Sequence, residues 1–237
     1  MGRTSPARDL LSVCCKHSVR YHVISVLSRH SCGAAPGKSP AHVEAARALA
    51  KVFHERGIRL VYGGGTVGIM GELAKTLVAL SGPDSVHGII PDALVRFERN
   101  WEPGQTVSKT INKDEFGRTT VVADMHERKQ MMAQEVMAGG EGSGFVALSG
   151  GYGTMEELME VVTWNQLGIH ARGVVLFNVE GYWDGILQWV RTAVSSGFIA
   201  ENNSSIMVEA KAPEEAVDAL ANYQNAEGRF KLEWGQK

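Results

Sequence analysis

Two glycine-rich segments have the residue types and spacing to bind a phosphate group. One reads GGGT at residues 63–66, and the other reads SGGYGT at residues 149–154. Glycines let backbone N–H groups approach a phosphate closely, and a helix that begins after such a turn adds partial positive charge. Each turn alone is weak evidence, because tight strand-to-helix turns also use glycine for geometry.

Neither segment ends in the Gly-Lys-Ser/Thr of the triphosphate loop, and the second segment lacks the full G-x-G-x-x-G of dinucleotide sites. We therefore expect a phosphorylated small molecule, and not ATP or NAD bound in their usual modes.

Short apolar strands alternate with amphipathic helices from residue 22 onward, and this alternation positions the glycine segments. A strand is predicted directly before each segment, and a helix directly after it. The alternation predicts a Rossmann-like α/β fold, a doubly wound parallel sheet with helices on both faces. Both glycine segments then lie at the carboxyl edge of the sheet, where such folds bind ligands. Predicted strands cover residues 22–27, 58–62, 86–90, 119–122, 145–148, 173–178 and 206–209. Predicted helices cover 41–56, 67–80, 124–137, 154–167, 182–196 and 213–223.

The predicted organisation is a single catalytic domain over residues 22–225, between a poorly ordered tail at 1–21 and a C-terminal tail at 226–237. Residues 97–118 are rich in charge, glycine and proline and show no period. We interpret them as a long active-site loop, because long irregular stretches in small domains are usually functional.

The composition is that of a globular protein, with 44% hydrophobic and 21% charged residues. The formal net charge of −2 predicts no general affinity for nucleic acid or a membrane. Three cysteines form neither a disulfide framework nor a zinc quartet, and no metal site is expected. A reducing, cytoplasmic location fits best.

Three motifs in order resemble the Lonely Guy family, the cytokinin riboside 5′-monophosphate phosphoribohydrolases formerly labelled lysine decarboxylases. They are YGGGTVGIMG at 62–71, DMHERK at 124–129 and GGYGTMEE at 150–157. The likeness continues through TWNQLGIH at 163–170 and covers roughly residues 32–222. Three separate motifs are far more specific than one glycine turn.

This resemblance implies hydrolysis of the N-glycosidic bond of a nucleoside 5′-monophosphate, with an N6-substituted AMP as substrate, in a homodimer without a cofactor. It implies that Arg128 and Glu157 are the catalytic pair. The residues that it implies for substrate or phosphate binding are Gly64, Gly65, Thr66, Glu98, Met125, Lys129, Gly150, Gly151, Tyr152, Gly153, Thr154, Glu156 and Thr163.

The chemistry suits these two residue types. Cleavage of the bond passes through an oxocarbenium-like ribose, which a carboxylate stabilises while it orients the attacking water. Glu157 follows the second glycine segment by one helical turn, so a ribose attached to a bound phosphate would fall near it. Arg128 has a fixed charge and a planar fork, suited to holding a phosphate, a ribose hydroxyl or Glu157.

The sequence departs from the family pattern in three places. Ser149 stands where the family has proline, and the loops at 101–118 and 139–144 are longer than in plant members, as in fungal or microbial relatives. The first apolar stretch ends four residues before the turn that begins at Cys32. We therefore expect the first strand to be displaced, polar or partly disordered.

Other interpretations remain open from the residues alone. Thr154 and Glu157 also form a capping-box pattern, in which the glutamate only satisfies the helix start. A nucleotide-binding or carrier module on the same fold would use the same turns without catalysis. A pyridoxal-phosphate decarboxylase would need a Schiff-base lysine, and no lysine stands out near either turn.

Overall fold

The computed structural model describes residues 22–27, 36–98, 111–232 and 234. Its strands are β1 (Val23–Leu27), β2 (Arg59–Tyr62), β3 (Val86–Pro91), β4 (Arg118–Val122), β5 (Gly144–Ala147), β6 (Gly173–Phe177) and β7 (Met207–Ala210). Its α-helices are α1 (Ala41–Glu55), α2 (Gly68–Ser81), α3 (Asp92–Glu98), α4 (Lys113–Phe116), α5 (Met125–Ala138), α6 (Tyr152–Gln166), α7 (Asp184–Ser195) and α8 (Pro213–Ala221). Short 3-10 turns are η1 (Pro83–Ser85), η2 (Val179–Gly181) and η3 (Glu201–Asn203).

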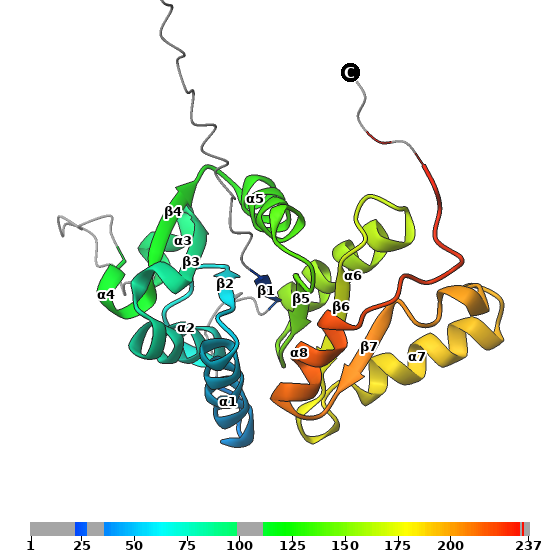
Figure 1. Cartoon of the computed structure of the whole chain (residues 1–237), viewed down its shortest axis with the longest axis horizontal. Coiled ribbons are helices and arrows are strands. Elements are labelled where there is room, and N and C mark those ends of the chain that lie inside the picture. The colour runs from blue at the N-terminus through cyan, green and yellow to red at the C-terminus, as the bar shows by residue number, and fades with distance from the viewer. Residues whose placement is uncertain (1–21, 28–35, 99–110, 233, 235–237) are drawn as a thin grey trace, which may run out of the picture.

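The strands form one seven-stranded sheet in the order β4-β3-β2-β1-β5-β6-β7 (Figure 1). All six neighbouring strand pairs are parallel. This arrangement confirms the predicted doubly wound, Rossmann-like α/β fold.

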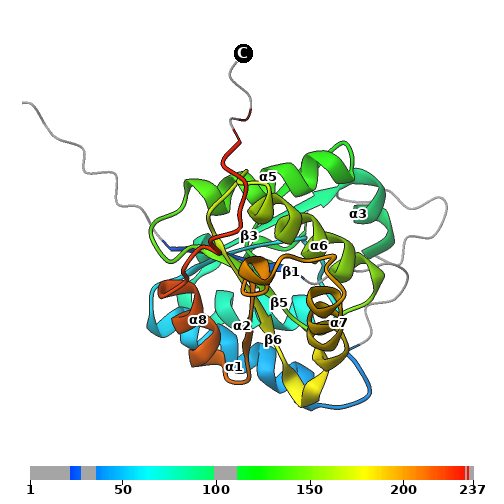
Figure 2. The ribbon, with the colours of Figure 1, turned by 90° about the vertical axis from the view of Figure 1, so that its right-hand side faces the viewer.

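Two apolar layers hold helices against the two faces of the sheet. On β2, Leu60 faces the layer that includes Phe53 of α1, whereas Val61 faces the layer that includes Met132 of α5. Successive side chains of a strand point to opposite faces, so a continuous apolar run on β2 serves both layers. Helices α1, α2 and α8 therefore cover one face, and α5, α6 and α7 cover the other (Figures 1 and 2).

The site is positioned by the reversal of strand order at β1. This strand pairs with β2 on one side and β5 on the other. The turns that follow β2 and β5 are the two glycine segments, so they flank the end of β1. Two strand spacings separate them, about 10 Å. Folds of this kind bind ligands at such a switch point.

The structure corrects our expectation for the first strand. β1 is a regular central strand, with Ile24 in register with Leu60 and with Gly144. Ile24, Ser25 and Val26 are all buried. The strand ends where the apolar run ends, at Leu27; the residues between it and position 36 lie outside the described part of the chain.

The prediction of one long loop over residues 97–118 is also wrong in part. Helix α3 runs to Glu98, α4 forms one turn capped by the side chain of Asn112, and β4 already begins at Arg118. Residues 99–110 lie outside the described ranges. A single helical turn is too short to show a period in the sequence, which explains why α4 was missed.

The chain after α8 packs against the end of α6. The Nε of Arg229 donates a hydrogen bond to the carbonyl of Asn165 over 2.7 Å. The N–H of Phe230 donates to the carbonyl of Gln166 over 2.8 Å. The indole of Trp234 donates to the carbonyl of Leu167 over 3.0 Å. The residues expected as a C-terminal tail thus satisfy the last carbonyls of α6.

None of the helices that the structure describes combines the length and the apolar character needed to cross a bilayer.

Candidate active site

The first glycine turn is shaped by close approaches that leave no room for a side chain. A Cβ on Gly63 would lie 1.8 Å from the Nη2 of Arg128, so the guanidinium rests directly on this glycine. Gly64 has φ +74°, a left-handed conformation that glycine adopts without strain. A Cβ on Gly71 would lie 2.3 Å from the carbonyl group of Thr66, which fixes Thr66 against the start of α2.

The second turn closes on itself in a similar way. Helix α6 begins at Tyr152, with Gly151 as its N-cap residue. A Cβ on Gly150 would lie 2.1 Å from the hydroxyl oxygen of Thr154, whose side chain is fully buried. The first N–H groups of a helix have no partner within it, so this turn presents donors that can bind an anion.

Arg128 and Glu157 meet between the two turns. Arg128 lies in the first turn of α5 and Glu157 in the second turn of α6, and their Nη1 and Oε1 atoms are 3.1 Å apart. Their side chains are only 2% and 3% exposed. The attraction between the two charges offsets part of the cost of burying them. The structure thus brings together the two residues expected to be catalytic.

The capping-box interpretation of Glu157 is wrong. Because α6 begins at Tyr152, Thr154 lies inside the first turn and not at the N-cap, and Gly151 makes no side-chain cap. A true capping interaction occurs instead at the start of α5. Asp124 accepts from the N–H groups of His126 and Glu127, and these bonds lower the pKa of the Asp124 carboxyl.

Residues around the pair tie α5 to α6. The Nη1 of Arg128 lies 3.8 Å from the sulfur of Met125. The ammonium of Lys129 is 2.5 Å from Glu156 and 3.1 Å from Glu160. Burial opposes the charge of Lys129, but hydrogen bonds and attraction from these two carboxylates prevail and raise its pKa. Lys129 and Glu156 thus form a charged link between the two helices beside the pair.

Other expected site residues are placed differently. Thr163 is exposed on α6, about 14 Å along the helix axis from Thr154, so the structure does not bring it to the glycine turn. Tyr152 is 92% exposed at the helix start. Glu98 ends α3, and its side chain lies outside the described part of the structure.

Some residues that support the turns are not among those predicted for the site. Gly63 is one of them, although three consecutive glycines signalled a close approach. The Oγ of Ser149 is hydrogen-bonded to the Nδ1 of His42 over 3.0 Å, and the hydroxyl of Tyr182 donates to the carbonyl of Gly150. His42 and Tyr182 come from distant segments that no local pattern connects to the turn.

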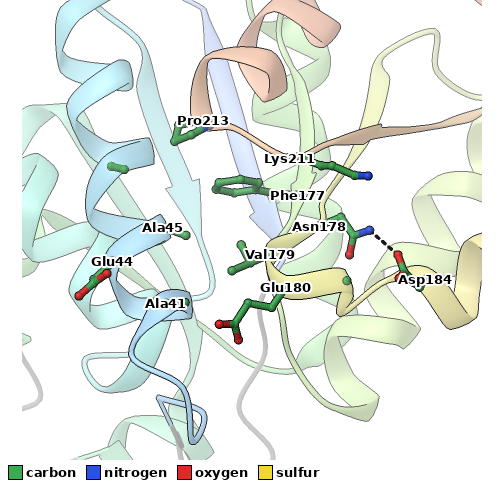
Figure 3. Close-up of a pocket in the computed structure, with 12 residues that line it drawn as sticks. Ala41, Glu44, Ala45, Phe177, Asn178, Val179, Glu180, Asp184, Lys211 and Pro213 are labelled. Atoms are coloured by element: carbon green, nitrogen blue, oxygen red, sulfur yellow. Dashed lines mark hydrogen bonds between the residues drawn. The ribbon is translucent and has the colours of Figure 1, made fainter.

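An open pocket lies beside these supports, on the side of the sheet that α1 covers (Figure 3). Its lining includes Ala41 and Ala45 of α1, Phe177 at the end of β6, and Glu180 of η2.

Within the described ranges, no three His, Cys, Asp or Glu side chains are grouped so that they could hold a metal ion.

Comparison with known proteins identifies the relatives of this chain. Residues 70–220 match the family model described as "Possible lysine decarboxylase". The chain is 51% identical over 202 residues to a bifunctional cytokinin biosynthesis protein of Fusarium pseudograminearum, a match covering 85% of this chain and 41% of that protein. It is 42% identical over 193 residues to a cytokinin riboside 5′-monophosphate phosphoribohydrolase of Arabidopsis thaliana, covering 81% of this chain and 80% of that protein.

The chain is also 42% identical to a cytokinin riboside 5′-monophosphate phosphoribohydrolase of Oryza sativa subsp. japonica, a match covering 81% of this chain and 71% of that protein. Among solved structures, a molybdenum cofactor carrier protein of Chlamydomonas reinhardtii superimposes with a TM-score of 0.56 at 18% identity, over 84% of this chain and 96% of that chain. This second likeness shows the fold alone. The sequence matches decide the family: the chain belongs to the Lonely Guy family of cytokinin riboside 5′-monophosphate phosphoribohydrolases.

Proposed function

We propose that this protein hydrolyses the bond between base and ribose in a nucleoside 5′-monophosphate, releasing a free adenine-type base and ribose 5-phosphate. The observation that carries the proposal is the buried pair of Arg128 and Glu157, which lies between two glycine turns built to bind an anion. The sequence relatives are named for this activity on cytokinin riboside 5′-monophosphates. An N6-substituted AMP is therefore the proposed substrate.

The reaction needs only water as co-reactant. The bond between C1′ and the base nitrogen breaks, and its electron pair leaves with the base, which takes up a proton. Positive charge develops on the ribose, where the Glu157 carboxylate stabilises it. A water molecule attacks C1′ and transfers a proton to Glu157. Glu157 then releases this proton to solvent, and the departing base takes up one proton from solvent, so the protons balance. Arg128 keeps its charge throughout and holds the carboxylate in place.

The two glycine turns supply the position of the substrate. A 5′-phosphate held at the start of α6 places the attached ribose near Glu157, one helical turn further along. Binding energy from a group remote from the scissile bond can then be used to orient the reacting atoms. The phosphate should contribute to turnover as well as to affinity.

The test is release of free base from matched N6-substituted adenosine, its 5′-monophosphate and its 5′-triphosphate at equal concentration. We expect rapid release from the monophosphate only, since the chain has no triphosphate-loop lysine to balance the extra charge. Equal rates on riboside and monophosphate would refute the phosphate site. Tight binding of the monophosphate without base release would indicate a carrier.

The lysine decarboxylase description in the family model is a poor guide to chemistry. A Schiff-base lysine must lose its proton to react, which requires a lowered pKa. Lys129 follows Arg128 directly in α5, and its two carboxylate partners raise its pKa despite partial burial. Its environment stabilises the charged form, which cannot attack a carbonyl.

A homodimer forms part of this proposal. Met155, Val162 and Trp164 of α6 are only partly buried, and Trp189 of α7 is 51% exposed. Both helices lie on the side that faces the viewer in Figure 2. Apolar side chains on one side of a molecule suit a two-fold interface. Light scattering at micromolar concentration should give twice the mass of one chain. Trp189→Glu should lower the measured mass toward that of one chain. A wild-type protein with the mass of one chain would refute the homodimer.

We also propose a cytoplasmic location, because the cysteine content suits a reducing compartment. Fractionation of cells that express the full chain tests it, and recovery with secreted proteins would refute it.

A further inference from the structure

Tyr182 contacts the second glycine turn. Its hydroxyl donates a hydrogen bond to the carbonyl oxygen of Gly150, 32 residues earlier in the chain. Gly150 precedes the N-cap residue of α6. The bond therefore acts on the peptide unit through which the turn enters the helix.

The planarity of the peptide bond makes this contact consequential. In a trans peptide the C=O and the following N–H lie in one plane and point in opposite directions. When Tyr182 holds the carbonyl of Gly150, the N–H of Gly151 must point away from Tyr182. Glycine residues allow a peptide unit many orientations, so a turn with two consecutive glycines needs an external contact to select one.

The segment that carries Tyr182 is anchored firmly. The side chain of Asn178 donates to Asp184 over 2.8 Å, a bond visible in Figure 3, and accepts from the N–H of Trp183 over 2.7 Å. Trp183 is 1% exposed, and its indole donates to the carbonyl of Ala147 on β5. Tyr182 thus extends from a buried anchor on the strand that leads into the turn.

A second contact supports the same turn from α1. His42 is hydrogen-bonded to Ser149, and its ring meets that of Tyr182 edge-on at 5.9 Å. Glu180 of η2 accepts from the hydroxyl of Ser39 over 3.1 Å, which joins η2 to the start of α1. The two residues that precede Gly151 are therefore each held by a side chain from a different element.

We propose that Tyr182 is a positioning residue for the substrate phosphate. By holding the Gly150 carbonyl, it directs the N–H of Gly151 toward the anion that the start of α6 binds. This inference rests on the proposed function and deepens it, since it assigns a residue outside the family motifs to recognition of the 5′-phosphate.

The decisive variant is Tyr182→Phe, which removes the hydroxyl and keeps the ring contacts with His42 and Trp183. Tyr182 is 45% exposed, so the fold should persist, as a thermal unfolding curve will verify. We expect KM for the nucleoside monophosphate to rise roughly five- to tenfold, the worth of one directed hydrogen bond. The slow rate on the riboside, which has no phosphate, should not change.

The matched control is Tyr223→Phe. The hydroxyl of Tyr223 also donates to a backbone carbonyl, that of Ile206, over 3.0 Å, but it lies away from the turn. This variant should leave KM for the monophosphate unchanged. An equal loss on monophosphate and riboside in Tyr182→Phe, or no loss on either, would overturn the proposal.

Calorimetric binding of AMP separates this proposal from the proposed function. If the wild-type protein binds AMP but releases no base from the N6-substituted monophosphate, the hydrolase proposal fails while the role of Tyr182 can still be measured. In that case weaker AMP binding by Tyr182→Phe than by Tyr223→Phe supports the positioning role. Equal AMP affinity of the two variants contradicts it.

Discussion

The Nη1 of Arg128 and the Oε1 of Glu157 are 3.1 Å apart across the interface of α5 and α6, and the two side chains are 2% and 3% exposed. Burial of two charges is costly, and their attraction offsets the cost only while both are present. The pair is therefore a structural tie as well as the proposed catalytic centre, and its variants must be assayed for both.

Glu157→Gln should abolish most base release. The amide keeps the shape but removes the charge that stabilises the oxocarbenium, so we expect a loss in kcat of at least about 100-fold. It also removes the carboxylate charge beside the buried Arg128, which should lower the free energy of unfolding by up to about 3–5 kcal/mol. Chemical denaturation and base-release assays measure the two effects. Glu55→Gln, at the exposed end of α1, is the control for stability. Near-normal turnover by Glu157→Gln would leave Glu157 with a structural role only.

Gly63→Ala should impair activity more than stability. The new Cβ would lie 1.8 Å from the Nη2 of Arg128, so the flexible guanidinium must move away from its present position. A displacement of this size can cost about 100-fold in rate. Gly185→Ala in α7 is the control, since a Cβ there meets nothing within 4 Å. Base release and thermal unfolding of both variants should be compared with wild type, and full activity of Gly63→Ala would mean that Arg128 can work from another position.

Lys129→Gln tests whether this lysine binds substrate or joins the helices. Its ion pairs with Glu156 and Glu160 predict a loss of about 1 kcal/mol in unfolding free energy, the upper range for partly exposed pairs. If the joining role dominates, KM for the monophosphate should change little. A large rise in KM with unchanged stability would show that Lys129 contacts the phosphate.

His170 should make stability depend on pH below neutrality. Burial lowers the pKa of His170 from 6.5 to about 4. The hydrogen bond to the Val161 carbonyl opposes this shift, and the charges of Arg229 and Arg172 add to it. Between these values the unfolded chain binds the proton and the folded chain does not, so stability falls as the pH is lowered. The loss by pH 4 amounts to about 3 kcal/mol.

Replacing this histidine should flatten that dependence. Urea unfolding of wild type and His170→Gln between pH 4 and pH 7 measures it, with the exposed His126→Gln as control. A slope that persists unchanged in His170→Gln would assign the effect to other groups.

Much of the fold followed from local patterns. The strands before the two glycine turns and the helices after them were predicted to within a few residues, because apolar period and turn glycines act through neighbours in the chain. The exceptions were short or lacked a period. Helix α4 is a single turn, and α3 follows β3 directly at Asp92 with no connecting turn to signal it.

The sequence by itself determined the parallel sheet, the two glycine turns at its carboxyl edge, and the family motifs that contain Arg128 and Glu157. Whether Glu157 caps a helix or faces an arginine could not be decided locally, because the same spacing serves both. That choice was made by the tertiary structure, which begins α6 at Tyr152 and packs α5 against it. The supports from His42 and Tyr182 likewise depend on the crossover connections that bring α1 and η2 behind the turn. Contacts between segments over 30 residues apart leave no periodic trace in the chain, since only the completed sheet makes them neighbours.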